Sequence, residues 1–215
     1  MTLRSLVCSI GVTGALVLAT VTMTAGAAIE RRSGTIPACD ELLTVRQALV
    51  AMGETVAGNV DREVVRSTRM CSYNGGSKAL GHGMGVAWGP YGDYRKGPFL
   101  GAKKYMCPVS KAACRNLEKA VRLRSNLNSF AFWAEALDQV GTAKRLPSSA
   151  FERNPAFFWI PSEALAPLDQ AAWVFVYDVK SAHLLQISCT DTAEMTPDTP
   201  CAIAAAKQAY KNITS

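Results

Sequence analysis

The chain has 215 residues, of which 49% are hydrophobic and 19% are charged, and it carries a formal net charge of +6. This length suits one domain with a well-formed core and is short for two domains. The balance of apolar and charged residues is typical of globular proteins, which excludes a mainly disordered or low-complexity chain.

The N-terminal segment has the three parts of a secretory signal peptide. Arg4 precedes an apolar stretch over 5–23, and small residues follow at Ala25-Gly26-Ala27-Ala28. We therefore predict that residues 1–28 are removed, that 29–38 form a flexible leader, and that the mature protein is secreted or periplasmic. A retained membrane anchor is the alternative, although glycines and threonines dilute a stretch that is already short for a bilayer.

Export changes the interpretation of the cysteines. Removal of the signal would take Cys8 and leave six: Cys39, Cys71, Cys107, Cys114, Cys189 and Cys201. An even number in an oxidising compartment predicts three disulfides, although six cysteines can pair in many ways. Pairing sequence neighbours (39–71, 107–114, 189–201) is the simplest arrangement. The sequence has no CxxC motif, so we predict no metal site.

The first predicted helix is Val45–Met52, because Thr44 and Gln47 have capping-box spacing and Gly53 is a common helix stop. A strand is expected over 63–73, ended by an Asn-Gly-Gly turn.

The stretch 80–101 is rich in glycine and proline. Apart from a short strand at 84–88, it is predicted to be irregular. Its aromatic residues would then be exposed on a mobile loop and form a ligand platform. Alternatively, they pin a long connection to the core. The residues of this candidate contact site are Trp88, Tyr91 and Tyr94, with Phe99 beside them.

Residues 103–141 are predicted to be mainly helical. Over 111–124 the pattern has two faces, with apolar residues opposite four cations: Lys111, Arg115, Lys119 and Arg122. Two residues seven apart in one helix are separated by about 10.5 Å, too far for a disulfide. Either 107–110 is a loop and the helix begins near Lys111, or Cys107 has a remote partner.

The last third of the chain alternates apolar runs and turns. A second helix, capped at Asn128 or Ser129, is expected to end at Gly141, and a connector follows over 142–154. Strands are expected at 156–160, 173–177 and 184–188, the last two as a hairpin. A terminal helix begins after Asp198. These elements predict an α+β fold: a mainly antiparallel sheet flanked by helices and stabilised by disulfides.

Positive charge is concentrated in one segment. Residues 95–124 contain nine Lys or Arg and one acid, Glu118, for a net charge of +8, whereas the rest of the mature chain sums to −3. This segment predicts an anionic partner, such as a cell-wall polymer, lipid headgroups or an acidic protein. The alternative is the solvated face of an amphipathic helix. Nucleic acid is not predicted for an exported domain without a recognisable binding motif.

No catalytic motif stands out. The two histidines, His82 among glycines and His183 near the hairpin turn, are interpreted as ordinary surface residues. GxSxG, HExxH and SxxK motifs are absent. We therefore predict a monomeric, non-catalytic binding or sensor-like module of the cell envelope or extracellular space, without a cofactor. The alternative is a secreted inhibitor or immunity-type protein whose loop 81–101 blocks a partner enzyme.

The segment Cys39-Asp40-Glu41-Leu42-Leu43-Thr44, followed by Gly53 and Cys71-Ser72-Tyr73, resembles the start of an uncharacterised family of actinobacterial secreted proteins and lipoproteins. That family is similar to extracellular sensor domains of mycobacterial membrane kinases, and its relatives have a PsbP-like α/β/α sandwich. The resemblance covers 39–73 and 140–213. We predict one domain over 39–215, in which the segment at about 80–135 is a basic helical insertion relative to that family, and the resemblance supplies no catalytic residues. A lipobox is absent, so no lipid tether is implied.

Overall fold

The centre of the structure, a computed structural model, is an antiparallel sheet. The structure describes residues 36–65, 67–76, 82–165, 170–192 and 194–215. The predicted signal peptide and most of the leader lie outside these residues. The strands are β1 (Ala57–Val65), β2 (Thr68–Gly75), β3 (His82–Pro90), β4 (Gly141–Arg145), β5 (Ala156–Pro161), β6 (Ala172–Asp178), β7 (His183–Asp191) and β8 (Thr196–Pro197).

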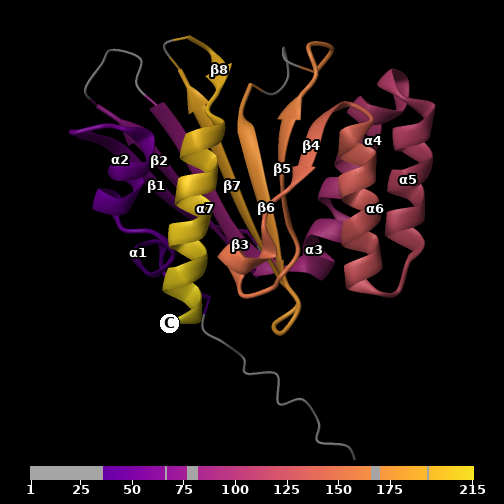
Figure 1. The fold of residues 1–215 in the computed structure, drawn as a ribbon, viewed down its shortest axis with the longest axis horizontal. Helices are drawn as coiled ribbons and strands as arrows, with labels where there is room; N and C mark the ends of the chain where they lie inside the picture. The colour runs from indigo at the N-terminus through magenta and orange to yellow at the C-terminus, as the bar shows by residue number, and fades with distance from the viewer. Residues whose placement is uncertain (1–35, 66, 77–81, 166–169, 193) are drawn as a thin grey trace, which may run out of the picture. The chain divides into compact units, whose positions relative to one another are not determined.

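All strand pairs are antiparallel, in the order β1-β2-β3-β7-β6-β5-β4, with β8 paired to β7. Helices cover both faces of the sheet, as Figure 1 shows. They are α1 (Cys39–Leu42), α2 (Val45–Met52), α3 (Tyr91–Lys96), α4 (Pro98–Val109), α5 (Lys111–Arg122), α6 (Asn126–Asp138) and α7 (Thr199–Thr214), with a 3-10 helix, η1 (Ser148–Phe151). The predicted α+β fold is confirmed.

Strand alternation divides the core between the two faces. In β6, Val174 and Val176 point to the layer of α1, α2 and α7, whereas Phe175 and Tyr177 point to the layer of α3–α6. The first layer packs small aliphatic residues of α7 onto the sheet. The second is aromatic, and Trp133 of α6 lies 4.5 Å from Phe175 between ring centroids. Both faces are covered, and β6 is accordingly apolar or aromatic from Ala172 to Tyr177.

Three disulfides join the pairs predicted from sequence neighbours: Cys39–Cys71, Cys107–Cys114 and Cys189–Cys201, with Cα–Cα distances of 5.9, 4.6 and 6.0 Å. The first ties α1 to β2, and the third ties β7 to α7. Among the described helices, none has the length and apolar character needed to cross a membrane.

The second disulfide is possible because the helix is interrupted. Cys107 lies in the last turn of α4, Ser110 is extended with φ −145°, and α5 begins at Lys111. The Ser110 hydroxyl then accepts a hydrogen bond from Ala113 N at 3.2 Å, which caps α5. The expected start of the helix near Lys111 is confirmed. The expected loop over 107–110 is wrong, because α4 continues to Val109.

Several predicted irregular stretches are regular. The glycine-rich stretch forms the long strand β3 and then α3 and α4, because β3 pairs with β2 and β7 on both sides. The connector expected over 142–154 contains β4 and η1. The single strand expected over 63–73 is wrong, because 63–65 end β1 and 68–73 belong to β2, which pairs with β1 in a hairpin. The helix α6 begins at Asn126 and is capped by Ser125, three residues before the expected cap.

Candidate functional site

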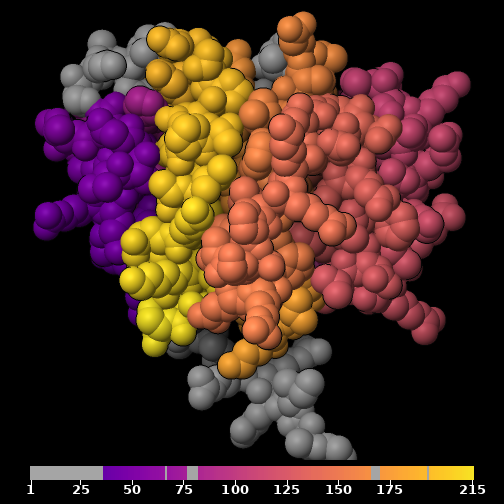
Figure 2. All heavy atoms as spheres, viewed as in Figure 1, coloured from indigo at the N-terminus to yellow at the C-terminus, as the bar shows by residue number. Residues whose placement is uncertain are grey.

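The helix α5 presents the predicted basic face to solvent. Its apolar side is buried through Ala113, Leu117 and Ala120. The four cations on the opposite side are exposed: Lys111, Arg115, Lys119 and Arg122. In Figure 2 the segment with α4 and α5 forms the right flank of the view, and long side chains extend from it.

The one acid of α5, Glu118, is paired to Lys103 and interacts more weakly with Arg122 of this face. The acid of the helix, Glu118, accepts a hydrogen bond from Lys103 Nζ of α4 at 2.7 Å. This bond and the Lys103 charge lower the pKa of the Glu118 carboxyl. Within the described part of the chain, none of the four cations forms an ion pair, and Lys119 Nζ lies 4.2 Å from the Phe132 ring centre. We define Lys111, Arg115, Lys119 and Arg122 as the basic face.

The expected exposure of the aromatic platform is wrong. Tyr91 and Tyr94 have exposed fractions of 0% and 7%, and they lie in α3, beneath the other helices of the aromatic layer. Burial raises the pKa of both phenols. Trp88 is half-buried and stacks on His183, with ring centroids 5.1 Å apart. Tyr91 and Tyr94 are spaced three apart, as on one helix face, a signal that the glycine content masked.

His82 is more enclosed than a surface histidine. Its side chain is 19% exposed, and its Nδ1 lies 3.1 Å from Glu54 Oε1. Its Nε2 lies 3.4 Å from Asp198 Oδ2 and 3.7 Å from Asp191 Oδ2. These carboxylates come from the ends of three elements, so their proximity to His82 could not be predicted from their spacing in the sequence. The arrangement joins the end of α2, the start of β3, the end of β7 and the cap of α7.

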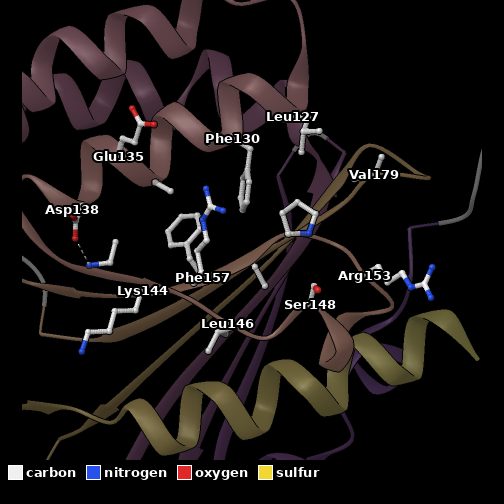
Figure 3. A pocket seen from close by; sticks show the side chains of 16 residues that line it. Leu127, Phe130, Glu135, Asp138, Lys144, Leu146, Ser148, Arg153, Phe157 and Val179 are labelled. Atoms are coloured by element: carbon white, nitrogen blue, oxygen red, sulfur yellow. Dashed lines mark hydrogen bonds between the residues drawn. The ribbon is translucent and has the colours of Figure 1, made fainter.

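A groove that sequence reasoning missed lies between α6 and the sheet edge. The helix α6 contacts β4 where the two follow each other in the chain, and farther along they border a groove of about 650 Å³. Phe130 of α6 and Phe157 of β5 meet in the middle of the groove in Figure 3. Two exposed apolar residues, Leu127 and Val179, also line the groove. This volume falls within the range of ligand sites, and the lining combines apolar side chains with charged ones.

The two ends of the groove carry opposite charges. Glu135 and Asp138 lie toward one end and Arg153 toward the other, as Figure 3 shows. Lys144 is on the alternate side of β4 and points away from the aromatic rings in this view. Asp138 Oδ1 accepts a hydrogen bond from Ala143 N at 3.0 Å. The groove therefore has aromatic rings in its middle, acids toward one end and Arg153 toward the other, and Lys144 and Arg145 also belong to its lining.

The segment that carries Arg153 is held in an unusual backbone conformation. Glu152 and Arg153 have φ of 49° and 68°, in the left-handed region. Asn154 fixes the segment: its side chain donates to Tyr210 Oη at 2.6 Å and accepts from Val179 N at 2.9 Å. Strained conformations maintained in this way are found preferentially at ligand sites. The Arg153 side chain is thus presented from a fixed backbone.

No family model matches the chain, and comparisons with curated proteins and with solved structures found no match.

Proposed function

We propose that the protein is an exported, non-catalytic binding module that engages a linear polyanion of the cell envelope through the basic face. The observation that carries this proposal is the unpaired, exposed state of its four cations on one side of α5. Three disulfides suit an oxidising compartment outside the cytosol. Part of this proposal is that the chain is related to the family of secreted proteins and lipoproteins that it resembles in sequence, whose relatives also have helices on both faces of a sheet.

The spacing of the cations favours a polymer over a single anion. Lys111 and Arg122 are separated by about 16 Å along the helix axis at a rise of about 1.5 Å per residue. One phosphate or carboxylate contacts one or two of these side chains, whereas a chain with repeated charges contacts all four. Such binding weakens as salt screens the charges.

The proposal is tested by charge reversal on the basic face. Lys111, Arg115, Lys119 and Arg122 are changed together to Glu, and the salt concentration that elutes the protein from a heparin column is measured. The matched control reverses Arg46, Lys180, Lys207 and Lys211, which are exposed cations outside the segment 95–124 and give the same change in net charge. Thermal melts of both variants verify their folding.

We expect the basic-face variant to elute at clearly lower salt than the control variant. Equal elution of the two would mean that retention follows net charge alone, and the proposal would fail. Vesicles of phosphatidylglycerol and phosphatidylcholine give a second comparison. Binding to these vesicles without retention on heparin would replace the polymer with a lipid surface.

A further inference from the structure

The groove between α6 and β4 is bordered by an open sheet edge. Among the described strands, β4 is the last of the sheet and pairs with β5 alone. Two hydrogen bonds set the alternation of this ladder: Leu146 N donates to Ala156 O at 2.9 Å, and Ser162 N donates to Val140 O at 3.0 Å. Thr142 and Lys144 therefore direct their backbone groups to β5.

The intervening residues direct their backbone groups outward, toward the groove. The Ala143 N–H donates a hydrogen bond to Asp138 Oδ1, so this donor is not open to an added strand. At Arg145 no described residue bonds the outward N–H or C=O, so the edge is open there. Arg145 also lines the groove together with Ala143 and Phe157. Backbone donors and acceptors beside an apolar floor are what an added strand requires.

The side chains of such a strand would meet two different environments. Successive side chains of a strand point to opposite sides, so every second one would face Phe130 and Phe157, and the others would face solvent. β4 has five residues, which spans about 17 Å at about 3.4 Å per residue. The Glu135 and Asp138 end attracts a cation, and the Arg153 end attracts an anion. The groove would therefore select a peptide by its extended backbone, by apolar side chains at alternate positions and by the charges at its two ends.

We propose that the α6–β4 groove binds an extended peptide as an added strand on β4. The peptide has apolar side chains at alternate positions, a basic residue at the Glu135 and Asp138 end, and an acidic residue or terminal carboxylate at the Arg153 end. This site is separate from the basic face, and the inference does not depend on the proposed polyanion binding. The partner is a protein segment of this chemistry, recognised mainly through its backbone.

The probes are two fluorescein-labelled peptides, KTVTVTE and ETVTVTK, whose charged ends lie on the same side as their valines and are placed for parallel and antiparallel addition, respectively. Binding is measured by fluorescence anisotropy. Each peptide has a counterpart with the same side chains but with alternate backbone nitrogens methylated, which cannot complete the strand ladder. We expect one of the two peptides to bind, and its methylated counterpart to bind at least about tenfold more weakly.

Two variants locate the site. Ala134→Trp fills the groove from α6 and is expected to weaken binding at least about tenfold, whereas Ala204→Trp, at an exposed alanine of α7, is the matched control with unchanged affinity. Arg153→Glu is expected to weaken the peptide that binds and to be rescued when the acidic end of that peptide is replaced by Lys. Reversal of the basic face should leave the affinity unchanged.

Three results would overturn the inference. Equal binding of the methylated peptide would show that the groove takes an apolar ligand without strand addition. Binding that survives both Ala134→Trp and Arg153→Glu would place the peptide elsewhere. No binding of either peptide at millimolar concentration would reject a strand site of this charge pattern. Each of these results is distinguishable from a failure of the heparin test, which concerns other residues.

Discussion

Tyr73 connects the sheet to the first helices through one hydroxyl group. From β2, it donates a hydrogen bond to Leu43 O at 2.6 Å, and Cys39 O lies at 3.1 Å. These carbonyls belong to the start of α1 and to its C-terminal cap. Because the side chain is buried, with 1% exposed, water cannot replace the lost partner.

We expect Tyr73→Phe to lower the free energy of unfolding by about 1–2 kcal/mol, since a buried carbonyl loses its donor while the ring packing is kept. The measurement is urea unfolding at neutral pH. Tyr105→Phe is the control, because that phenol is 47% exposed and the substitution should be nearly neutral. Equal effects of the two substitutions would contradict the role assigned to the hydroxyl.

The same hydroxyl predicts a pH dependence. Burial, aided by the Asp40 charge, raises the pKa of Tyr73 to about 12 from its usual 10.0. The folded state therefore retains a proton that the unfolded chain loses, and the free energy of unfolding falls as pH rises from about 10 to about 12. Tyr73→Phe should show a shallower fall, because the contribution of this phenol is removed. The fall should not vanish, because Tyr91, Tyr94 and Tyr210 still contribute. An unchanged slope in urea unfolding between pH 9 and pH 11.5 would reject this account.

Contacts of single residues could be predicted from the sequence where the partners are close in the chain. The capping pair Thr44 and Gln47 and the stop at Gly53 were predictable, because all their partners lie within a few residues. The contacts of His82 and Tyr73 were not, since their partners are 28 or more positions away and depend on the strand order.

At the scale of elements, the break at Ser110 organises the α4–α5 pair. The helix α4 ends at Val109, and the Ser110 hydroxyl caps α5. We expect Ser110→Ala to lower the free energy of unfolding by about 1 kcal/mol, because the N–H of Ala113 loses its acceptor. Ser149→Ala, at an exposed position in η1, is the matched control for the urea measurement. A larger loss in the control would contradict the capping role.

Elements were predicted well where local signals and packing agree. α2, α5, α7 and the hairpin of β6 and β7 follow from caps and alternation. α3 and α4 did not, because Gly92 and Gly101 argue against helices by composition. Both glycines have open space around the missing side chain, and the helices are stabilised by burying Tyr91, Phe99 and Met106. The groove was also unpredictable, because it exists only where β4 becomes the sheet edge.

At the scale of the whole domain, the disulfides are unevenly distributed between the two layers. The four cysteines of the first and third disulfides are buried in the aliphatic core under α1, α2 and α7. The second disulfide links α4 to α5, away from the sheet. The aromatic layer is therefore held to the sheet by ring contacts such as Phe130 to Phe157 at 5.1 Å and by hydrogen bonds such as that from Trp159 Nε1 to Leu137 O at 3.0 Å.

The lengths of the loops that the three disulfides close predict the order of their contributions to stability. The chain separations are 32, 12 and 7 residues for Cys39–Cys71, Cys189–Cys201 and Cys107–Cys114. Replacing each pair by Ala should lower the free energy of unfolding by about 4, 3 and 2 kcal/mol in that order, because longer loops restrict the unfolded chain more. Urea unfolding of the three double variants measures this order, and a largest loss for Cys107 and Cys114 would contradict it.

Hydrogen exchange of the same variants tests whether the two layers open independently. Removing Cys189–Cys201 frees the start of α7 from β7, so we expect faster exchange in α7 and α2, which pack together, and unchanged exchange in α6. Removing Cys107–Cys114 should speed exchange in α4 and α5 alone. Sub-global openings of this kind require that the sheet keeps one face packed while the other is exposed. A uniform rise across both layers would instead show that the sheet and its two cores unfold as one cooperative unit, with each disulfide acting only on the unfolded chain.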